Sequence, residues 1–414
     1  MKTILTLVVL VAIGFVASRR LFTETRLRLP ITVVFLTGIE FFFLGVILGP
    51  NMLNLITVEV LEDLKPVIYL ALGWAGLLFG VQMSRRHLGR LSRNVVRLTV
   101  QESVATSVVV SAVLFFVIRL ALPEAANTEV VSAAVMLGIT AGISSPTIVA
   151  VLSRVLPSRG KFTTMARITS SLSAVVPLLV FGFFFTVAHH GFMVQGRFLS
   201  GLIWWLFANF VGVAMGFVFV QLTLRRMARD ERLLLIIGTT MFVGGICYLL
   251  SLSALYTSMV MGVVVANFSK RRVLIFEQLM SLEKTLYVAF LILLGTVVTV
   301  SGNLWMGIIA VCVVLRLILK LTLSGKLIRR NFPEFANLGP SVGLVYSAQG
   351  GMALAVAIDF GQGTQGGLVD VIVVVIAGCV VVNEFAGVVL TRRALAASGE
   401  TQVRRAPGDR AVTR

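Results

Sequence analysis

The chain has 414 residues, of which 57% are hydrophobic and 13% are charged, and its mean hydropathy is +0.98. Because a soluble domain is about one-quarter charged, this composition excludes an ordinary soluble globule, a disordered chain and a disulfide scaffold. The net charge of +18 would suggest nucleic-acid binding in a soluble protein. Here the Lys and Arg residues lie between apolar blocks, where they set membrane topology, so we expect no nucleic-acid partner.

Long apolar blocks make up most of the chain. Each is long enough to cross about 30 Å of hydrocarbon as a helix, and none alternates at the period of two that barrel strands show. Thirteen blocks are predicted, near residues 3–18, 30–48, 66–84, 95–118, 130–153, 165–188, 199–221, 233–250, 254–268, 285–300, 304–324, 338–358 and 369–391. The sequence therefore predicts an all-α polytopic membrane protein with about 13 transmembrane helices. The first block also has features of a signal peptide, but Arg19 and Arg20 follow it directly and favour a retained helix.

The distribution of basic residues predicts the orientation. With the N-terminus outside, the cytoplasmic segments are 19–29, 85–97, 154–167, 222–232, 269–284, 325–332 and the tail from 392. They hold 30 of the 36 basic residues, whereas the outer segments hold only Lys2, Lys65, Arg119 and Arg197. This bias predicts an N-terminus outside and a C-terminus in the cytoplasm, for which a bacterial inner membrane is the expected location.

Three further features concern the segments between and after the spans. Seven acids, Asp359 among them, lie in predicted outer segments. Residues 269–284 have the pattern of an interfacial helix. Residues 398–414 are polar and basic, which predicts a disordered cytoplasmic tail after a transmembrane transporter domain at 1–397.

Two predicted spans, 130–153 and 338–358, contain residues that interrupt a helix. The proline removes a backbone donor and clashes with the preceding turn, the glycines loosen the helix, and the polar side chains can satisfy freed backbone groups or coordinate a ligand. The residues are Thr140, Ser144, Ser145, Pro146 and Thr147 in the first span and Gln349, Gly350 and Gly351 in the second. Either span alone reads as a kinked packing helix. Because the two lie seven spans apart, they fit two inverted six-helix repeats whose broken helices cross at a transport site.

Five ionisable residues lie inside predicted spans, where charges are costly and are candidates for function. They are Glu40, Glu102, Arg316, Lys320 and Glu384. Glu102, Arg316 and Glu384 fall at a similar depth, roughly 10–12 Å from the cytoplasmic face. One hypothesis is that Glu102 or Glu384 only neutralises Arg316; the other is that a carboxylate binds and releases protons beside the cation. For Lys320 we favour snorkelling to the interface.

Several motifs accompany these features, at residues 44–50, 72–82, 144–152, 255–267, 276–295, 347–352 and 383–400. In order and spacing, the chain resembles the monovalent cation:proton antiporter superfamily, which has the sodium/hydrogen exchanger fold, over nearly all of residues 30–400. The resemblance implies a scaffold of spans 1–3 and 7–10, and a moving core of spans 4–6 and 11–13 in which the broken helices cross. It also implies homodimers, alternating access and a cationic residue in the eleventh span, the position of Arg316 or Lys320.

One departure from the family affects the expected mechanism. The family carries an Asp in the sixth span that binds the cation and the proton in turn, whereas residues 168–177 contain no acid. Their hydroxyls can coordinate an ion but cannot carry a proton near neutral pH. These hydroxyls belong to Thr169, Ser170, Ser171 and Ser173. Proton coupling must therefore use Glu102, Glu384 or Glu40.

The leading hypothesis is a secondary transporter that exchanges a monovalent cation, Na⁺ or K⁺, for protons, with Glu102 and Glu384 substituting for the missing Asp. One alternative keeps the scaffold but moves an anion or zwitterion, which Arg316 and Lys320 would favour. Another is a non-transporting membrane sensor or partner protein that has lost the ion site. The sequence contains no phosphate-binding loop, no Ser/His/Asp arrangement and no metal-ligand spacing, so we expect no enzymatic activity, cofactor or bound metal.

Overall fold

The structure is a computed structural model, and it describes residues 39–50, 52–156, 158, 160–189, 197–224, 227–297, 303–363 and 368–400. The predicted span 3–18 and most of the predicted tail lie outside the described residues. The helices in the first half are α3 (Ile39–Leu48), α4 (Val58–Asp63), α5 (Lys65–Gln82), α6 (Arg85–Leu88), α7 (Arg93–Ala121), α8 (Asn127–Ala141), α9 (Pro146–Val155), α10 (Lys161–Leu172), α11 (Val175–His189) and α12 (Arg197–Leu222). Those in the second half are α13 (Arg229–Leu250), α14 (Ala254–Phe268), α15 (Arg272–Val297), α16 (Asn303–Leu319), η1 (Lys320–Ser324), α17 (Gly325–Asn331), η2 (Pro333–Phe335), η3 (Pro340–Tyr346), α18 (Gly351–Gly363) and α19 (Val369–Ala397).

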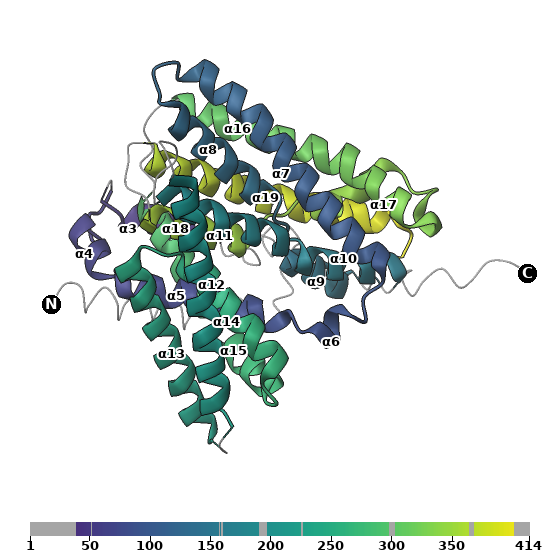
Figure 1. Ribbon diagram of the computed structural model, residues 1–414. Helices are drawn as coiled ribbons and strands as arrows, with labels where there is room; N and C mark the ends of the chain where they lie inside the picture. The colour runs from purple at the N-terminus through teal and green to yellow at the C-terminus, as the bar shows by residue number, and fades with distance from the viewer. Residues whose placement is uncertain are drawn as a thin grey trace, which may run out of the picture.

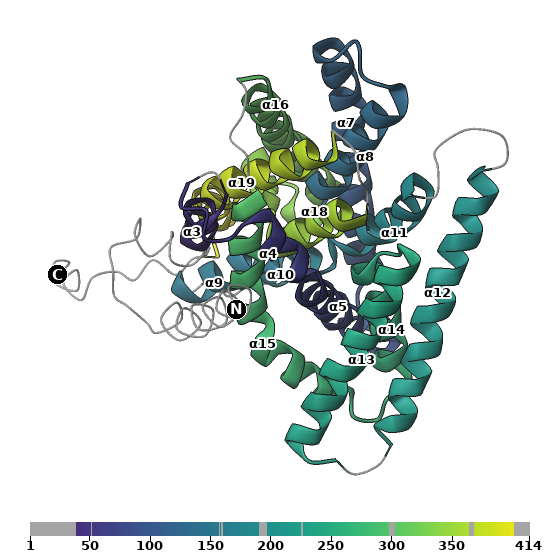
Figure 2. The same cartoon turned by 90° about the vertical axis from the view of Figure 1, so that its left-hand side faces the viewer.

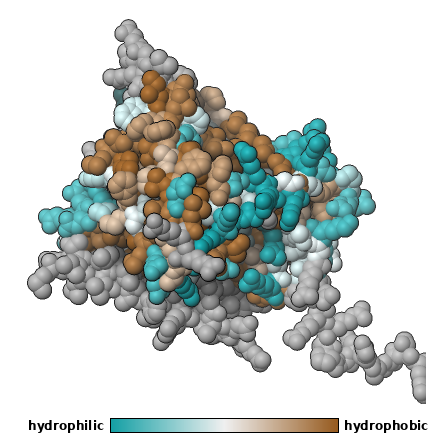
Figure 3. Space-filling view, turned by 60° about the horizontal axis from the view of Figure 1, so that its bottom comes forward, coloured by the Kyte–Doolittle hydropathy of each residue, from teal (hydrophilic) through white to brown (hydrophobic). Residues whose placement is uncertain are grey.

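Many of these helices are apolar enough to cross a membrane. Within the described residues, eight helical segments have the length and composition of a span, and the bent pair of η3 and α18 makes a ninth. Large apolar side chains such as Phe116, Leu120 and Leu249 are exposed on them, and in Figure 3 apolar surface covers the middle of the molecule between hydrophilic margins. The prediction of an all-α polytopic membrane protein is confirmed, whereas the count of 13 spans stays a prediction.

One group of packed helices comprises α5, α12, α13 and α14, with α3 and α15 beside them. Close approach of α5 and α14 depends on glycine, because a Cβ atom on Gly76 would lie 2.1 Å from the carbonyl oxygen of Leu255. A Cβ atom on Gly80 would likewise lie 2.1 Å from the carbonyl oxygen of Met259. Small residues that let helix backbones touch are typical of membrane interfaces, where lipid supplies no hydrophobic drive to helix association.

A second group of packed helices comprises α7, α8, α16, α18 and α19, with η1 and η3. Here Gly138 of α8 and Gly142, directly after α8, face Ser111 and Ser107 of α7. A Cβ atom on Gly138 would lie 1.9 Å from the Ser111 hydroxyl, and one on Gly142 would lie 2.2 Å from the Ser107 hydroxyl. In both ribbon views α12 and α13 extend toward one end of the molecule, and α7, α8 and α16 toward the other (Figures 1 and 2).

The interfacial helix predicted at 269–284 is wrong as a separate element. α15 runs without a break from Arg272 to Val297, so the predicted interfacial segment and the following span form one helix. Its first half packs into the protein: Ile275 and Leu279 are buried, and the Trp74 indole N–H donates to the Leu279 carbonyl at 3.1 Å. One side of the amphipathic segment is therefore covered by α5.

The turn between α13 and α14 lies inside the protein. Ser251 reverses the chain in the left-handed conformation, with φ of 52°, and the residues from Leu252 to Tyr256 are all buried. α14 has 15 residues, about 22 Å of helix, which is too short to cross a bilayer of about 30 Å. Its N-terminal end therefore depends on protein partners rather than water.

Candidate functional site

The first predicted break is confirmed between α8 and α9. α8 ends at Ala141 and α9 begins at Pro146, because proline fits the first turn of a helix but not its interior. Ser144 and Ser145 in the connection are buried, whereas Pro146 and Thr147 are exposed at the start of α9. The hydroxyl of Thr140 donates back to the carbonyl of Leu137 within α8 at 3.0 Å, so it helps to satisfy its own helix.

The second predicted break is confirmed between η3 and α18, which meet at 52°. Gly350 has φ of +79°, a conformation that favours glycine, and a Cβ atom there would lie 3.0 Å from the Ser145 side chain. The Ser145 amide donates to the Ala348 carbonyl at 2.9 Å, and the Ser144 hydroxyl donates to the Tyr346 carbonyl at 3.2 Å. The two interrupted helices therefore cross at their breaks and share backbone hydrogen bonds.

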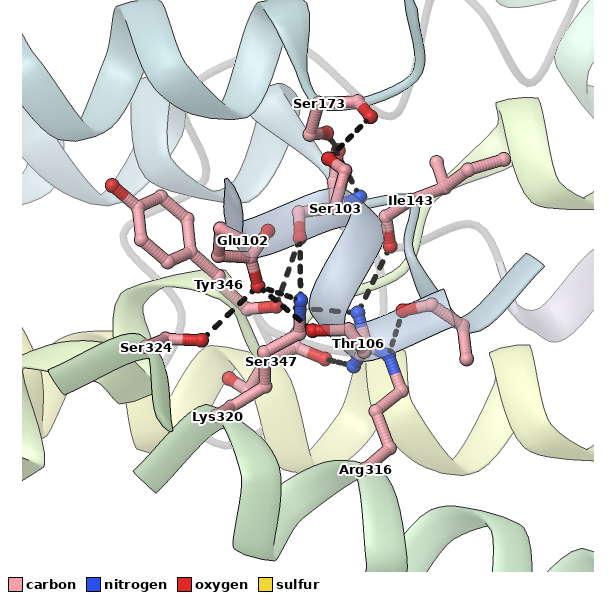
Figure 4. A network of polar contacts seen from close by, with 12 residues as sticks. Glu102, Ser103, Thr106, Ile143, Ser173, Arg316, Lys320, Ser324, Tyr346 and Ser347 are labelled. Atoms are coloured by element: carbon pink, nitrogen blue, oxygen red, sulfur yellow. Dashed lines mark hydrogen bonds and ion pairs between the residues drawn. The ribbon is translucent and has the colours of Figure 1, made fainter. Parts of the chain in front are cut away.

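A buried guanidinium joins the two breaks. Arg316 of α16 is 0% exposed, and its nitrogens donate to five backbone carbonyls (Figure 4). Two of the carbonyls belong to the first break, Ala141 at 3.0 Å and Ile143 at 2.9 Å. The other three belong to the second break, Tyr346, Ser347 and Ala348. These are carbonyls that a broken helix leaves without an intrahelical partner.

Glu102 and Glu384 form no ion pair with Arg316 among the described residues, so the expectation that one of them pairs directly with it is wrong. Among the described residues, the ion pairs are Lys65–Glu62, Lys161–Glu334 and Lys320–Glu102, and none involves Arg316. The planar guanidinium has five N–H donors in a fork, and at this position the freed carbonyls occupy them.

Lys320 forms the buried ion pair instead. Its ammonium contacts Oε1 of Glu102 on α7. The Lys320 side chain is 0% exposed and the Glu102 side chain is 1% exposed. The expectation that Lys320 snorkels to the interface is therefore wrong. Lys320 begins η1, a π-helical turn, and η3 packs so closely that a Cβ atom on Gly343 would lie 2.1 Å from the Lys320 carbonyl oxygen.

Hydroxyl groups surround the Glu102 carboxylate. Ser324, at the end of η1, donates to Oε1 at 3.1 Å, and Thr106 donates to the same atom at 3.4 Å. The Lys320 ammonium also lies 3.4 Å from the Ser144 hydroxyl, so the ion pair adjoins the crossing (Figure 4). The other oxygen of Glu102, Oε2, is buried and has no partner among the described residues.

The sixth span contributes a third interruption, which the sequence did not predict. α10 ends at Leu172 and α11 begins at Val175. Between them, the Ser173 hydroxyl accepts from the Ser144 amide at 3.0 Å, and the Ser173 carbonyl accepts from the Ser103 hydroxyl at 2.8 Å. Ser173 therefore attaches α10 to the first break and to α7.

The other hydroxyls predicted on the sixth span differ from one another. Those of Thr169 and Ser170 are buried and have no partner among the described residues. Ser171 is only half-buried, and its hydroxyl donates to the Ile168 carbonyl of its own helix at 2.8 Å. Thr169 and Ser170 are therefore available as ligands, whereas Ser171 is not placed as one.

A second polar group flanks the crossing from α19. Glu384 of α19 is buried. Gln349 donates to the Thr140 carbonyl at 2.7 Å and accepts from Asn383 at 3.0 Å. Gln349 thus joins the second break to α8 and α19, whereas a role of Glu384 in coupling stays a prediction.

Two acids lie elsewhere. Glu40 is half-buried on α3, which packs against α15, and it takes no part in the network around Arg316 and Lys320. Asp359 was expected in an outer segment, which is wrong: it lies within α18, is 1% exposed, and contacts the first turn of α14. Hydropathy placed the end of the span at 358, whereas the helix continues to Gly363.

The groups of this site that could coordinate an ion are oxygen atoms. Within the described part of the chain, no group of three or more His, Cys, Asp and Glu side chains could hold a metal ion. What the site presents are hydroxyls, carbonyls of unwound backbone and the carboxylates of Glu102 and Glu384. Unwound carbonyls and half-helix ends are the groups that coordinate Na⁺ and protons at the midplane of transporters.

Comparison with solved structures identifies the fold. The structure of the sodium proton antiporter MjNhaP1 from Methanocaldococcus jannaschii at pH 8 aligns with a TM-score of 0.61 and 14% sequence identity, over 96% of this chain and 97% of the other. An electron-microscopy structure of the same antiporter aligns with a TM-score of 0.55 and 16% identity, over 87% and 88% of the two chains. The chain has the sodium/proton antiporter fold. No protein-family model and no curated protein matches the sequence.

Proposed function

We propose that this protein is a secondary transporter that exchanges a monovalent cation, Na⁺ or K⁺, for protons. The observation that carries the proposal is the buried Glu102–Lys320 pair beside the crossing of two broken helices. Such a pair is expensive to keep in a membrane interior, and the antiporter fold supports the same assignment.

In the proposed cycle, the cation and Lys320 compete for Glu102. Without the cation, the ammonium neutralises the carboxylate. A cation that binds Glu102 and the neighbouring hydroxyls leaves the ammonium without an anionic partner in a dry interior, where the charged form is unfavourable. Lys320 then releases a proton, and the reverse step binds one. Glu384 is the second carboxylate of the site, and Ser144 and Ser324 are the proposed hydroxyl ligands.

Arg316 has a separate role in this proposal. Its donors are used by carbonyls of both breaks, so it fixes the geometry of the crossing and leaves the exchange to Glu102. This arrangement also counts against an anion as substrate, because Arg316 and Lys320 both already have partners.

The proposal includes the architecture implied by the family. Spans 1–3 and 7–10 form a scaffold, and spans 4–6 and 11–13 form a core that moves against it in a homodimer. The N-terminus is outside and the C-terminus in the cytoplasm of a bacterial inner membrane.

Proteoliposomes with an internal pH dye test the function. A gradient of sodium, potassium or lithium chloride should move protons in the native protein, and Glu102→Gln should abolish that movement. Glu129→Gln is the matched control, because Glu129 lies in the first turn of α8, away from the network. Full proton movement in Glu102→Gln would contradict the mechanism. A native protein that responds to no cation but takes up a labelled organic anion would contradict cation exchange itself.

A further inference from the structure

The N-terminal end of α14 is buried and needs hydrogen-bond acceptors. Ser253, the residue before the helix, accepts from the Tyr256 amide at 2.9 Å. A helix start leaves further amides without an intrahelical partner, and the residues from Leu252 to Tyr256 around this one are all buried. Asp359 of α18 supplies the acceptor: its Oδ2 atom accepts from the Leu255 amide at 3.3 Å and from the Ser253 hydroxyl.

This contact joins the two groups of helices. α14 packs mainly with α5 and α12, whereas α18 is the second half of a broken helix and packs mainly with α19. In Figure 2, α18 lies between α19 and the pair of α5 and α14. Asp359 is eight residues beyond the start of α18, about 12 Å along the helix from the crossing. It is therefore separate from the Glu102–Lys320 pair.

We propose that Asp359 is a latch that holds the core against the scaffold in the conformation of this structure. The carboxylate sits at the positive end of the α14 dipole, where an anion is stabilised, and charge-assisted hydrogen bonds are stronger than neutral ones. A displacement of α18 relative to α14 removes the acceptor of the Leu255 amide and of the Ser253 hydroxyl at once. The latch therefore sets the equilibrium between this conformation and the next one in the cycle.

The direction of the effect follows from the topology, and it rests on the proposed function. With the N-terminus outside, the start of α14 and the end of α18 lie in the outer half of the membrane. The latch then stabilises the conformation that is closed toward the outside, and weakening it favours outward opening.

Hydrogen exchange of the full-length protein in lipid nanodiscs tests the latch without any assay of transport. Asp359→Asn keeps the shape and one acceptor oxygen but removes the charge, and amide exchange at residues 254–258 should rise about tenfold through more frequent opening. Ser253→Ala removes the hydroxyl that donates to Asp359 and accepts from the Tyr256 amide. It leaves the Leu255 amide its carboxylate acceptor, so the rise at the same residues should be smaller. Asp230→Asn is the matched control, because Asp230 is an acid at the start of a helix, α13, but is exposed and far from the contact between α14 and α18.

Two results would overturn the latch. One is unchanged exchange at residues 254–258 in both Asp359→Asn and Ser253→Ala. The other is a rise of equal size along the whole of α5 and α14, since that is general destabilisation. Native exchange rates elsewhere in each variant confirm that it has folded.

Sided transport measurements separate a latch from a purely structural contact. A shift in the conformational equilibrium changes the apparent affinity for sodium in opposite directions on the two sides, so Asp359→Asn should bind sodium more tightly from outside and more weakly from inside. Equal loss of affinity on both sides would contradict the latch. If the native protein moves no cation, the proposed function fails, while the exchange experiment still decides whether Asp359 holds α18 to α14.

Discussion

Two buried cations one helical turn apart on the same span have different partners. Arg316 donates to carbonyls of both broken helices, whereas Lys320 contacts a single carboxylate, Glu102. A guanidinium presents a rigid fork of donors, and an ammonium is a compact charge on a flexible stem. The difference separates two tasks: Arg316 holds two interrupted backbones together, whereas Lys320 neutralises the one carboxylate that, in the proposed cycle, a transported cation would bind.

The largest expected effect is the loss of the crossing. Arg316→Met removes the donor of the Ala141, Ile143 and Ser347 carbonyls, whereas the Tyr346 and Ala348 carbonyls keep the Ser144 hydroxyl and the Ser145 amide. Because each unsatisfied buried group costs about 1–3 kcal/mol, we expect the free energy of unfolding to fall by at least about 3 kcal/mol, so that little folded protein survives purification. Size-exclusion profiles and thermal unfolding in detergent measure this.

Two further variants sharpen that result. Arg316→Lys keeps the charge but loses the fork, so its stability should lie between the native protein and Arg316→Met. Arg330→Met removes an exposed arginine of α17 and should leave the unfolding temperature unchanged. A stable Arg316→Met protein would show that the carbonyls find other donors.

The second largest effect concerns the Glu102–Lys320 pair. Removing one partner of a buried ion pair typically costs about 3–5 kcal/mol, so Glu102→Gln and Lys320→Met should each be clearly destabilised. The double variant leaves no uncompensated charge and should be more stable than the sum of the single effects predicts, by up to about 3 kcal/mol. Thermal unfolding of the four proteins closes the cycle.

Transport distinguishes this pair from Arg316. The double variant should fold yet move no protons in response to a cation, because the exchangeable carboxylate is gone. If the losses of stability of the two single variants instead add up to that of the double variant, the ammonium and the carboxylate do not stabilise each other, which would contradict their contact.

A smaller effect tests how the sixth span reaches the crossing. Ser173→Ala removes the acceptor of the buried Ser144 amide, and an orphaned amide costs about 1–3 kcal/mol. Ser171→Ala is the matched variant, since the Ser171 hydroxyl bonds only to its own helix, and a change of about 0.5 kcal/mol or less is expected. Equal unfolding temperatures for the two variants would show that the Ser173 hydroxyl does not stabilise the crossing.

The positions of both breaks were predictable from the sequence, because Pro146 and Gly350 act on the backbone locally. Distance along a helix also gave the depth of Glu102 and Arg316 correctly enough to place them near one another. It could not give the direction in which each side chain points, so the wrong cation was paired with Glu102. Lys320 and Ser324, the two ends of a π-helical turn, both contact Glu102, and the residues of that turn do not predict a π-helix.

Asp359 was misplaced for a different reason. Hydropathy assigns an acid near the end of an apolar block to the adjoining loop, and that is correct when water is the available partner. Here the partner is the buried start of α14, far away in the sequence. The burial of that helix start could not be predicted either, because Ser251 and Ser253 have the composition of an ordinary exposed loop between two spans. Pairings of this kind depend on tertiary contacts that a single sequence does not reveal.

The smallest effect concerns the far end of α10, at the opposite end of that helix from Ser173. The Glu400 carboxylate accepts from the Phe162 amide at 2.8 Å and from the Thr163 amide at 2.9 Å, so it caps the helix that carries Ser173 to the crossing. Glu400→Gln keeps one acceptor but loses the charge at the helix start, and a loss of about 1 kcal/mol in stability is expected.

Glu334→Gln is the matched control, because the Lys161–Glu334 pair at 3.3 Å is 82% and 44% exposed, and pairs of that kind contribute little. Thermal unfolding should therefore rank Glu400→Gln below Glu334→Gln. The reverse order would mean that Ser173 attaches α10 to the crossing without support from Glu400.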